Sequence, residues 1–281
     1  MNKTTRRKFL QITAAAAVAG SLKAREPENS LLQTENSGHK RLKLGLASYT
    51  FRKFNLDDTL AMTKRLELKK IAFKSFHLPL ESTRQEIKQI SEKVRQAGFD
   101  LYGCGVVYMK DEAEVQHAFD YAKAAEMEVI IGVPEHNLLD LVNKKVQEYN
   151  IRLAIHNHGP GDERYPSPQS AYDLIKNMDQ RMGLCLDIGH SMRLGLDPAQ
   201  AAEQFADRLY DVHIKDVTAA SAEGQSIEIG RGIIDIPLFL STLLKINYQG
   251  TVAFEFEKDE MDPLPGLAES LGYVKGILSV I

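Results

Sequence analysis

The chain has 281 residues, of which 43% are hydrophobic and 26% are charged, and its formal net charge is −3 at pH 7. Residues 1–24 hold five of the 35 basic residues and none of the 38 acidic ones, so residues 25–281 carry 30 basic and 38 acidic residues, a net charge of −8. This balance argues against a nucleic-acid-binding protein, and the roughly 240 residues after Arg41 are enough for one large domain.

The N-terminal segment, "NKTTRRKFLQITAAAAVAG", places basic residues before a short Ala-rich apolar run. The run is too short to span a bilayer and is typical of a removable export signal. Its "TRRKFL" resembles a twin-arginine motif, which predicts a periplasmic protein; a chance Arg-Arg pair in a disordered tail is the alternative. We therefore predict a signal over residues 1–24, with cleavage after Ala19 or Ala24, and a flexible lead-in over residues 25–41. No later stretch is long enough for a stable membrane anchor.

From Lys43 onward, short apolar runs alternate with amphipathic segments, a pattern typical of parallel βαβ units. The predicted strands are 43–51, 70–78, 100–109, 129–135, 151–159, 182–190, 209–217 and 250–257. Helices are predicted between them, for example over 82–97 and 112–126, and three others begin near Pro168, Pro198 and Pro263. Eight such units over residues 42–281 predict an α/β protein with a single (β/α)8 TIM barrel as its catalytic domain. An open doubly wound sheet is the alternative, but no G-x-G-x-x-G follows the first strand.

The two cysteines, Cys104 and Cys185, each lie inside a predicted strand. The two strands are far apart in order, so the thiols need not approach within reach of a disulfide bond. We predict two free, buried thiols without a catalytic part.

Polar residues alternate with apolar ones in the last four predicted strands. In the fifth, "LAIHNHG", Leu153 and Ile155 share one face and His156 and His158 share the other. The corresponding polar faces of the next three strands carry Asp187, His213 and Lys215, and Glu255 and Glu257. The apolar face must pack on the helices, so the polar face points to the barrel axis. Because unpaired burial of these groups would cost several kcal/mol each, they compensate one another or hold a divalent cation at the carboxyl ends of the strands.

The histidines support a functional site at these ends. Six of the eight lie at or just past predicted strand ends: His77, His136, His156, His158, His190 and His213. A single such histidine would most often be structural. Six together with several carboxylates indicate a metal site, because imidazole and carboxylate are the usual ligands of borderline divalent metals.

Three segments, "LCLDIGH", "VHIKD" and "GTVAFEFE", resemble the xylose-isomerase-like barrel superfamily of sugar phosphate isomerases and epimerases. The resemblance extends from Lys43 to the end. It implies a divalent metal, most often manganese, with magnesium, cobalt or zinc as alternatives. It also implies that Asp187, His213 and Glu255 are ligands and that His190 contacts substrate. The remaining ligand in that family is a fifth-strand glutamate, which moves the proton in ketose epimerases. This chain has His156-Asn157-His158 where many relatives have Glu-Asn-His. We therefore predict His156, Asp187, His213 and Glu255 as metal ligands and His156, His158 and Glu255 as catalytic residues.

A second group of residues is predicted to bind substrate. Lys74, inside the apolar "IAFKSFHLP", is costly to bury unless it faces an anionic group or an oxyanion; a structural ion pair is the alternative. The other members of the predicted group are His77, His190, Lys215, Arg231 and Glu257. Glu135 and His136 are further candidates, with helix capping as the alternative. Two loops, 159–168 and 228–235, either cover the site or only connect elements.

These features predict a metal-dependent sugar isomerase or epimerase that transfers a proton beside a polarised carbonyl. The predicted export and the small number of cationic side chains at the predicted site favour an unphosphorylated sugar or glycoside as its partner. The imidazole at the fifth strand keeps a 3-keto-glycoside lyase or hydratase as the alternative, because such an elimination needs only one base. A non-catalytic sugar-binding protein and an apurinic endonuclease share the barrel; the charge of −8 argues against the latter. A homo-oligomer is compatible with the sequence.

Overall fold

The computed structural model describes residues 42–281. The predicted export signal and lead-in lie outside the described residues. Among residues 42–281, no helix combines the length and the apolar character needed to cross a bilayer.

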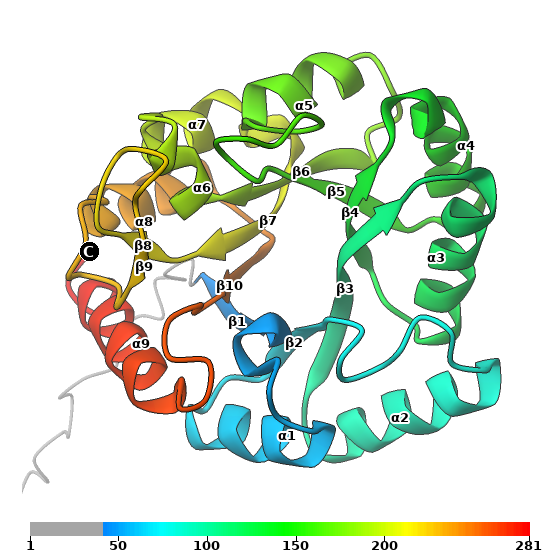
Figure 1. Cartoon of the computed structure of the whole chain (residues 1–281), viewed down its shortest axis with the longest axis horizontal. Helices are drawn as coiled ribbons and strands as arrows, with labels where there is room; N and C mark the ends of the chain where they lie inside the picture. The colour runs from blue at the N-terminus through cyan, green and yellow to red at the C-terminus, as the bar shows by residue number, and fades with distance from the viewer. Residues whose placement is uncertain (1–41) are drawn as a thin grey trace, which may run out of the picture. The chain divides into compact units, whose positions relative to one another are not determined.

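Eight parallel strands close into a barrel (Figure 1), which confirms the predicted (β/α)8 fold. The strands are β1 (Lys43–Ala47), β2 (Lys70–Phe73), β3 (Asp100–Met109), β4 (Val129–Pro134), β5 (Arg152–His156), β6 (Met182–Asp187), β7 (Leu209–Ile214) and β10 (Thr251–Phe254). The order around the barrel is β1-β10-β7-β6-β5-β4-β3-β2. A short antiparallel pair, β8 (Asp216–Val217) and β9 (Ser226–Ile227), follows β7.

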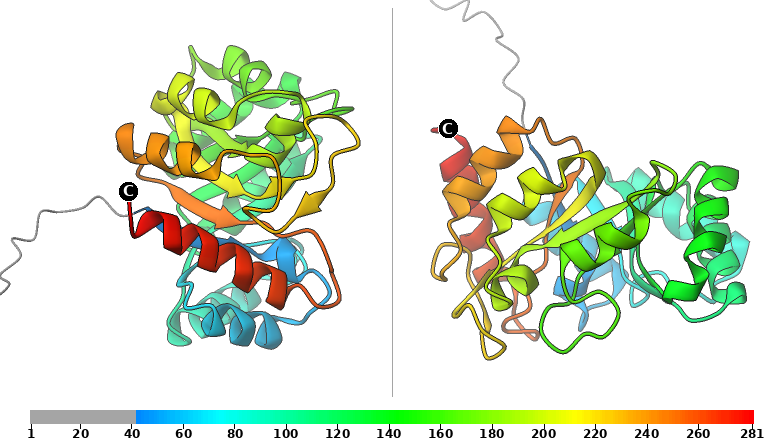
Figure 2. Two further views of the ribbon diagram at one scale, coloured as in Figure 1. Left: turned by 90° about the vertical axis from the view of Figure 1, so that its left-hand side faces the viewer. Right: turned by 90° about the horizontal axis from the view of Figure 1, so that it is seen from above.

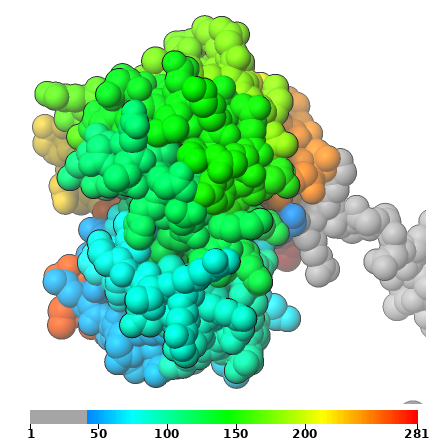
Figure 3. Space-filling view, turned by 90° about the vertical axis from the view of Figure 1, so that its right-hand side faces the viewer, coloured from blue at the N-terminus to red at the C-terminus, as the bar shows by residue number. Residues whose placement is uncertain are grey.

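Helices surround the barrel, as the two side views in Figure 2 show. They are α1 (Leu56–Arg65), α2 (Arg84–Gln96), α3 (Glu112–Ala124), α4 (Leu139–Tyr149), α5 (Pro168–Ile175), α6 (Ile188–Arg193), α7 (Pro198–Gln204), α8 (Ile236–Lys245) and α9 (Leu264–Leu278), with 3-10 turns η1 (Ser48–Phe51), η2 (His136–Leu138) and η3 (Ala206–Arg208). Figure 3 shows the outer surface on the side of α3 and α4. Local sequence sets the helix starts: Thr83 and Glu86 form a capping box at α2, and Ser167 caps α5 with Pro168 inside its first turn.

Side chains on the two faces of the strands form two separate clusters. Those on the outer face pack against the helices in a large cluster that includes Ile71, Leu153 and Leu184. Those on the inner face form a small cluster inside the barrel, made of Ala72, Tyr102, Val129, Ile131, Ala154 and Cys185. Cys104 and Cys185 are free and buried, as predicted. The predicted polar side chains lie above this small cluster, at the carboxyl ends of the strands.

The strands begin where the sequence predicts, within one residue, but most end earlier. β5 ends at His156 and β6 at Asp187, whereas the prediction extended them to 159 and 190. After Asp187 the chain turns directly into α6, whose first turn is capped by the Asp187 carboxylate accepting from the backbone N–H of His190 at 2.8 Å. The ends are therefore set by side-chain capping and loop geometry rather than by apolar alternation.

Candidate active site

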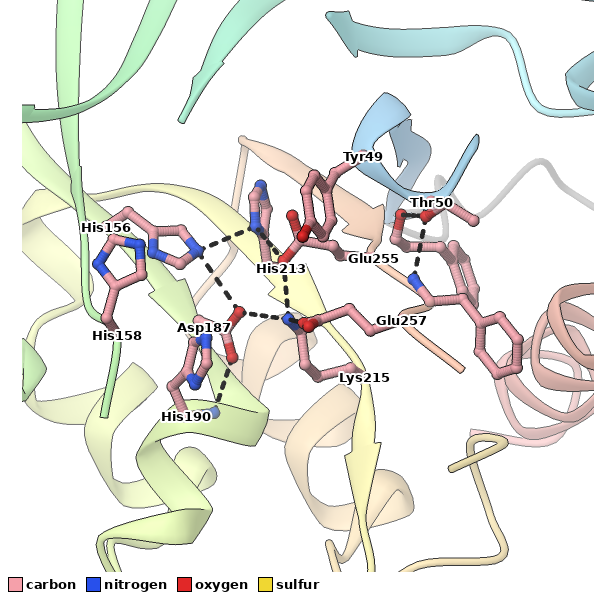
Figure 4. A network of polar contacts seen from close by, with 12 residues as sticks. Tyr49, Thr50, His156, His158, Asp187, His190, His213, Lys215, Glu255 and Glu257 are labelled. Atoms are coloured by element: carbon pink, nitrogen blue, oxygen red, sulfur yellow. Dashed lines mark hydrogen bonds and ion pairs between the residues drawn. The ribbon is translucent and has the colours of Figure 1, made fainter. Parts of the chain in front are cut away.

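Four of the predicted ligands come together at the carboxyl ends of β5, β6, β7 and β10. Ligand atoms of His156, Asp187, His213 and Glu255 all lie within 4.8 Å of one another. The register of the barrel accounts for this, because Asp187 pairs with His213 across β6 and β7, and His156 pairs with Cys185 across β5 and β6. Figure 4 shows the four side chains converging.

The spacing of these atoms fits a divalent cation. His156 Nε2 lies 3.1 Å from His213 Nδ1 and 3.4 Å from Asp187 Oδ2, and His213 Nδ1 lies 3.1 Å from Glu255 Oε2. Ligand atoms that share one ion at about 2.0 to 2.2 Å lie roughly 3 Å apart. Asp187 Oδ2 is buried and lies 2.9 Å from Lys215 Nζ and 3.4 Å from His156 Nε2, so it points into this group of ligand atoms. The two imidazoles and two carboxylates therefore form a four-residue cluster that could hold a metal ion, referred to below as the metal cluster.

Cys185 is the alternative to the carboxylates, because its sulfur also lies within 4.8 Å of ligand atoms of His156 and His213. Burial raises the pKa of the Cys185 thiol well above its usual value, and the carboxylates of Asp211 and Asp187 raise it further. A neutral thiol is a poor ligand. The carboxylate set is the better metal cluster.

Lys215 carries the positive charge of this region. Its side chain is buried, and Nζ lies 2.9 Å from Asp187 Oδ2, 2.7 Å from Glu255 Oε2 and in contact with Glu257. Burial alone would lower the pKa of Lys215, but the three carboxylates hold it well above its usual value. Burial alone would raise the pKa of Glu255, but His213 and Lys215 hold it well below its usual value. Glu255 is therefore ionised near pH 7.

A cavity of about 240 Å³ opens over the cluster. Its lining residues are Tyr49, Lys74, Val106, Tyr108, His156, His158, His190, Glu255 and Glu257. The volume is below the ~300 to 1,000 Å³ of sites for drug-sized ligands, so one small ring would fill it. The cavity has two unlike walls: the β5 to β10 side is imidazole and carboxylate, and the β1 to β3 side is largely apolar and aromatic.

His158 is held by residues on both sides. Its Nε2 lies 3.2 Å from the Tyr108 hydroxyl, its Nδ1 lies 3.7 Å from Asp162 Oδ2, and its ring stacks on Tyr108 with centroids 5.8 Å apart. Burial lowers the pKa of His158, and the neighbouring His190 lowers it further. Burial lowers the pKa of His156 much more, to about 3. Both imidazoles are therefore neutral near pH 7, which suits one for proton transfer and the other for metal binding.

Lys74, also predicted to bind substrate, lines the cavity opposite the histidines. Its Nζ donates to the Val106 carbonyl at 2.5 Å and lies 5.7 Å from the centre of the Tyr108 ring. Burial lowers the pKa of Lys74. In the described part of the chain this lysine forms no ion pair, so the alternative of a structural ion pair does not hold.

Three of the six residues predicted to bind substrate do not line the cavity. Lys215 is paired with the carboxylates of the cluster, and the other two, His77 and Arg231, lie away from the cavity. His77 is buried between hydroxyl groups, with Nδ1 2.9 Å from Ser48 Oγ and Nε2 2.9 Å from Thr59 Oγ1, so it braces the turn after β1. Arg231 is exposed, and its NH2 nitrogen donates to the Glu269 carboxylate on α9 at 2.7 Å. His77 is therefore held by structural hydrogen bonds, and Arg231 forms an ion pair on the surface.

The candidates at the end of β4 belong to another depression in the surface. Glu135 Oε1 accepts from Arg164 Nε at 2.6 Å, and His136 Nε2 lies 2.9 Å from the Arg164 carbonyl. They line a shallow pocket with Asp162 rather than the cavity over the metal cluster. Of the six histidines at strand ends, only His156, His158, His190 and His213 converge, with ring centroids of neighbouring pairs 4.5 to 6.0 Å apart.

Of the two loops, 159–168 reaches the site, because its Asp162 contacts His158. The loop 228–235 is held by Asp216, whose buried carboxylate accepts from the backbone N–H groups of Gly230, Gly232 and Ile234 at 3.0 to 3.2 Å.

The sequence did not single out Tyr49, Tyr108, Asp162 or Asn157.

Asn157 fixes the backbone that carries Asp187. Its Oδ1 accepts from the Asp187 N–H at 3.0 Å, and its Nδ2 donates to the Asp187 carbonyl at 3.2 Å. We expect Asn157→Ala to lower the free energy of unfolding by about 2 kcal/mol and to weaken metal binding, because the buried N–H and carbonyl of Asp187 lose their hydrogen-bond partners. Denaturant titration and chelator competition measure the two effects. Asn143→Ala is the control: it removes a single bond, from the Asp179 N–H, far from the cluster, and should leave metal affinity unchanged.

Two curated proteins are similar in sequence to part of this chain. The rhizopine catabolism protein MocC of Rhizobium meliloti is 31% identical over 154 residues, 49% of this chain and 45% of that protein. The inosose dehydratase of Mesomycoplasma hyopneumoniae (strain 7448) is 25% identical over 160 residues, 50% and 53% of the two chains. The chain thus spans about half the length of these relatives.

Among solved structures, an IOLI protein with a binding zinc atom superposes with a TM-score of 0.71 at 16% identity, over 85% of this chain and 98% of that one, which shows a common fold. A family model described as xylose isomerase-like TIM barrel matches residues 135–277. Because this match spans half of the sequence, the chain belongs to the xylose isomerase-like TIM barrel family.

Proposed function

We propose that the protein is a divalent-metal-dependent lyase or dehydratase that removes a proton beside the carbonyl of a keto-sugar and expels a neighbouring oxygen substituent. The observation that carries this proposal is the asymmetry of the cavity. Glu255 and Glu257 enter from the β10 side and are both bound to Lys215, whereas the opposite wall presents Tyr49, Val106 and Tyr108. A cavity with its free base on one side suits an elimination, which needs one base, better than a symmetric proton exchange.

The side chains divide the work as follows. His158 takes the carbon-bound proton at Nε2, in place of its contact with the Tyr108 hydroxyl, and returns it to the departing oxygen, because its imidazole is neutral, lines the cavity and is oriented by Tyr108 and Asp162. A bound divalent cation supplies the positive charge that polarises the carbonyl. His156, Asp187, His213 and Glu255 would hold that cation. Lys215 keeps the carboxylates of Asp187 and Glu255 ionised.

The substrate we propose is an unphosphorylated sugar or glycoside in keto form. Lys74 is the only lysine or arginine among the described residues that line the cavity, and two carboxylates share the lining with it, so a phosphate group would be repelled. Tyr49 and Tyr108 offer aromatic faces to a sugar ring. The name inosose dehydratase of one relative is consistent with loss of water from a keto substrate. The basic, Ala-rich N-terminal segment favours action in the periplasm, where sugar phosphates are not the usual metabolites.

Isomerisation or epimerisation is the second candidate function. The observation in its favour is that His158, just after β5, and Glu257, just after β10, both line the cavity, so two proton-transferring groups could reach one substrate. This would require Glu257 to leave Lys215 during the reaction.

The test uses metal-loaded protein in deuterated water, with 3-keto-glucosides in one set of reactions and free ketoses in another. We expect release of the aglycone from the keto-glucosides, and a decrease in kcat of about 10² to 10⁴ in His158→Ala. His136→Ala, which removes an imidazole outside the cavity, should react at the wild-type rate. Epimerised, deuterium-labelled ketose without aglycone release would reject the lyase in favour of the isomerase, and an unchanged rate in His158→Ala would reject its role as base.

A further inference from the structure

A buried carboxylate lies directly beneath the metal cluster. Asp211 is on β7, two residues before His213, so both side chains point into the barrel. Asp211 is completely buried, Oδ1 lies 4.0 Å from His213 Nε2, and Oδ2 has no hydrogen-bond partner. Its polar neighbours besides His213 are the Tyr102 hydroxyl and the Cys185 thiol, the latter 3.8 Å from Oδ1, and neither carries a charge that balances the carboxylate. A carboxylate in such surroundings costs several kcal/mol, so a purely structural role does not account for it.

The two ring nitrogens of His213 face different partners. Nδ1 lies 3.1 Å from both Glu255 Oε2 and His156 Nε2, within the metal cluster. Nε2 points the other way, is buried and has no hydrogen-bond partner. A ring nitrogen that binds a metal carries no proton, so with Nδ1 as ligand the proton of a neutral His213 is on Nε2, the nitrogen nearest to Asp211.

We infer that Asp211 is a positioning residue for the metal site: its carboxylate attracts the Nε2–H of His213 and so fixes the tautomer and ring orientation that present Nδ1 to the cation. Carboxylate–histidine–metal arrangements of this kind orient the ligand and raise its basicity. The inference rests on the proposed metal function of the cluster.

The His156 ring makes a useful comparison. Its Nε2 also faces the cluster, but its other nitrogen, Nδ1, is buried without a hydrogen-bond partner and no carboxylate lies within 4.0 Å of it in the described chain. Of the two imidazole ligands, only His213 has a carboxylate behind it. Loss of Asp211 should therefore act through His213 alone.

The experiment measures metal affinity and metal-free stability in the same variants. In Asp211→Asn the side chain keeps its size and loses its charge. We expect the Kd for Mn²⁺ and Zn²⁺, from chelator competition at pH 8, to rise 10- to 100-fold, while the Tm of the metal-free protein stays the same or increases. Asp211→Ala, which also loses the acceptor, should weaken binding at least as much. Cys185→Ala is the matched control, because it removes the thiol that contacts Asp211 and leaves the Asp211 carboxylate in place. The Kd of this variant should stay within about threefold of wild type.

The outcomes separate the inference from the proposed function. A wild-type protein that binds no divalent metal would reject both the metal cluster and the inference. Tight binding in the wild type with unchanged Kd in Asp211→Asn and Asp211→Ala would reject the inference alone. A lowered Tm of the metal-free Asp211 variants with unchanged Kd would also reject the inference, because it would show that Asp211 is structural. Weaker metal binding in Cys185→Ala only would reject it as well, because the thiol would then be a ligand.

Discussion

Replacing Lys215 by methionine should leave the metal-free protein barely stable and the metal-loaded protein folded. The ammonium group is the one lysine or arginine cation in contact with the Asp187, Glu255 and Glu257 carboxylates in the described chain. Removing one partner from a buried ionic cluster costs about 3 to 5 kcal/mol, a large share of the stability of a single domain. A divalent cation bound by two of the same carboxylates would restore the positive charge. We therefore expect a large fall in Tm in the presence of chelator and recovery when Mn²⁺ is added.

Metal affinity should change in the opposite direction from stability. Nζ of Lys215 lies 2.9 Å from Asp187 Oδ2 and 2.7 Å from Glu255 Oε2, so the ammonium group competes with a cation for these oxygens. Lys215→Met should therefore bind Mn²⁺ more tightly than the wild type. Lys74→Met is the control, because Lys74 lies at the same cavity but bonds a carbonyl rather than a carboxylate. Its Tm should respond to metal as the wild type does. Equal responses of the two variants to metal would contradict a cation site at these carboxylates.

The barrel and the convergence of polar side chains at one rim could be predicted because both depend on periodicity, whereas the choice of the four ligands came from the resemblance to the xylose-isomerase-like family. Side chains two residues apart in a strand share a face, and parallel strands of a closed barrel end at one rim. These two constraints bring His156, Asp187, His213 and Glu255 together once their strands are identified. The same parity placed Asp211 inside the barrel, although nothing in the sequence marked it as different from a buried structural carboxylate.

Residues on loops could not be placed in this way. His77 and Arg231 follow strands as the residues lining the cavity do, but the Ser48 and Thr59 hydroxyls hold the first, and Glu269 on α9 pairs with the second. The aromatic wall was missed for a similar reason. Tyr49 lies in a 3-10 turn where a strand was predicted, and Tyr108 follows a register shift between β3 and β4.

Asp187→Asn should abolish metal binding and turnover more completely than any other isosteric change at the site. Its Oδ2 is buried, lies 2.9 Å from Lys215 Nζ and 3.4 Å from His156 Nε2, and carries the charge that a cation would neutralise. Burial alone would raise the pKa of Asp187, but Lys215 and His190 hold it well below its usual value, so the wild-type ligand is a carboxylate at neutral pH. Asparagine can still accept from the His190 N–H, so the start of α6 is kept and the loss falls on the metal. We expect the Kd for Mn²⁺ to rise by at least about 100-fold, which corresponds to roughly 2.7 kcal/mol, and kcat to fall to background.

Glu257→Gln is the matched control for this change. Glu257 also contacts Lys215 and lines the cavity, but it lies outside the cluster of four mutually close ligand atoms. Neutralising it removes the same charge from the same lysine without removing a ligand, so the Kd for Mn²⁺ should stay within about threefold of wild type. If isomerisation needs Glu257 as a second proton-transferring group, kcat on ketoses would fall in this variant while metal binding persisted. Equal losses of metal affinity in Asp187→Asn and Glu257→Gln would show that the cluster attracts cations by its overall charge and not through four defined ligands.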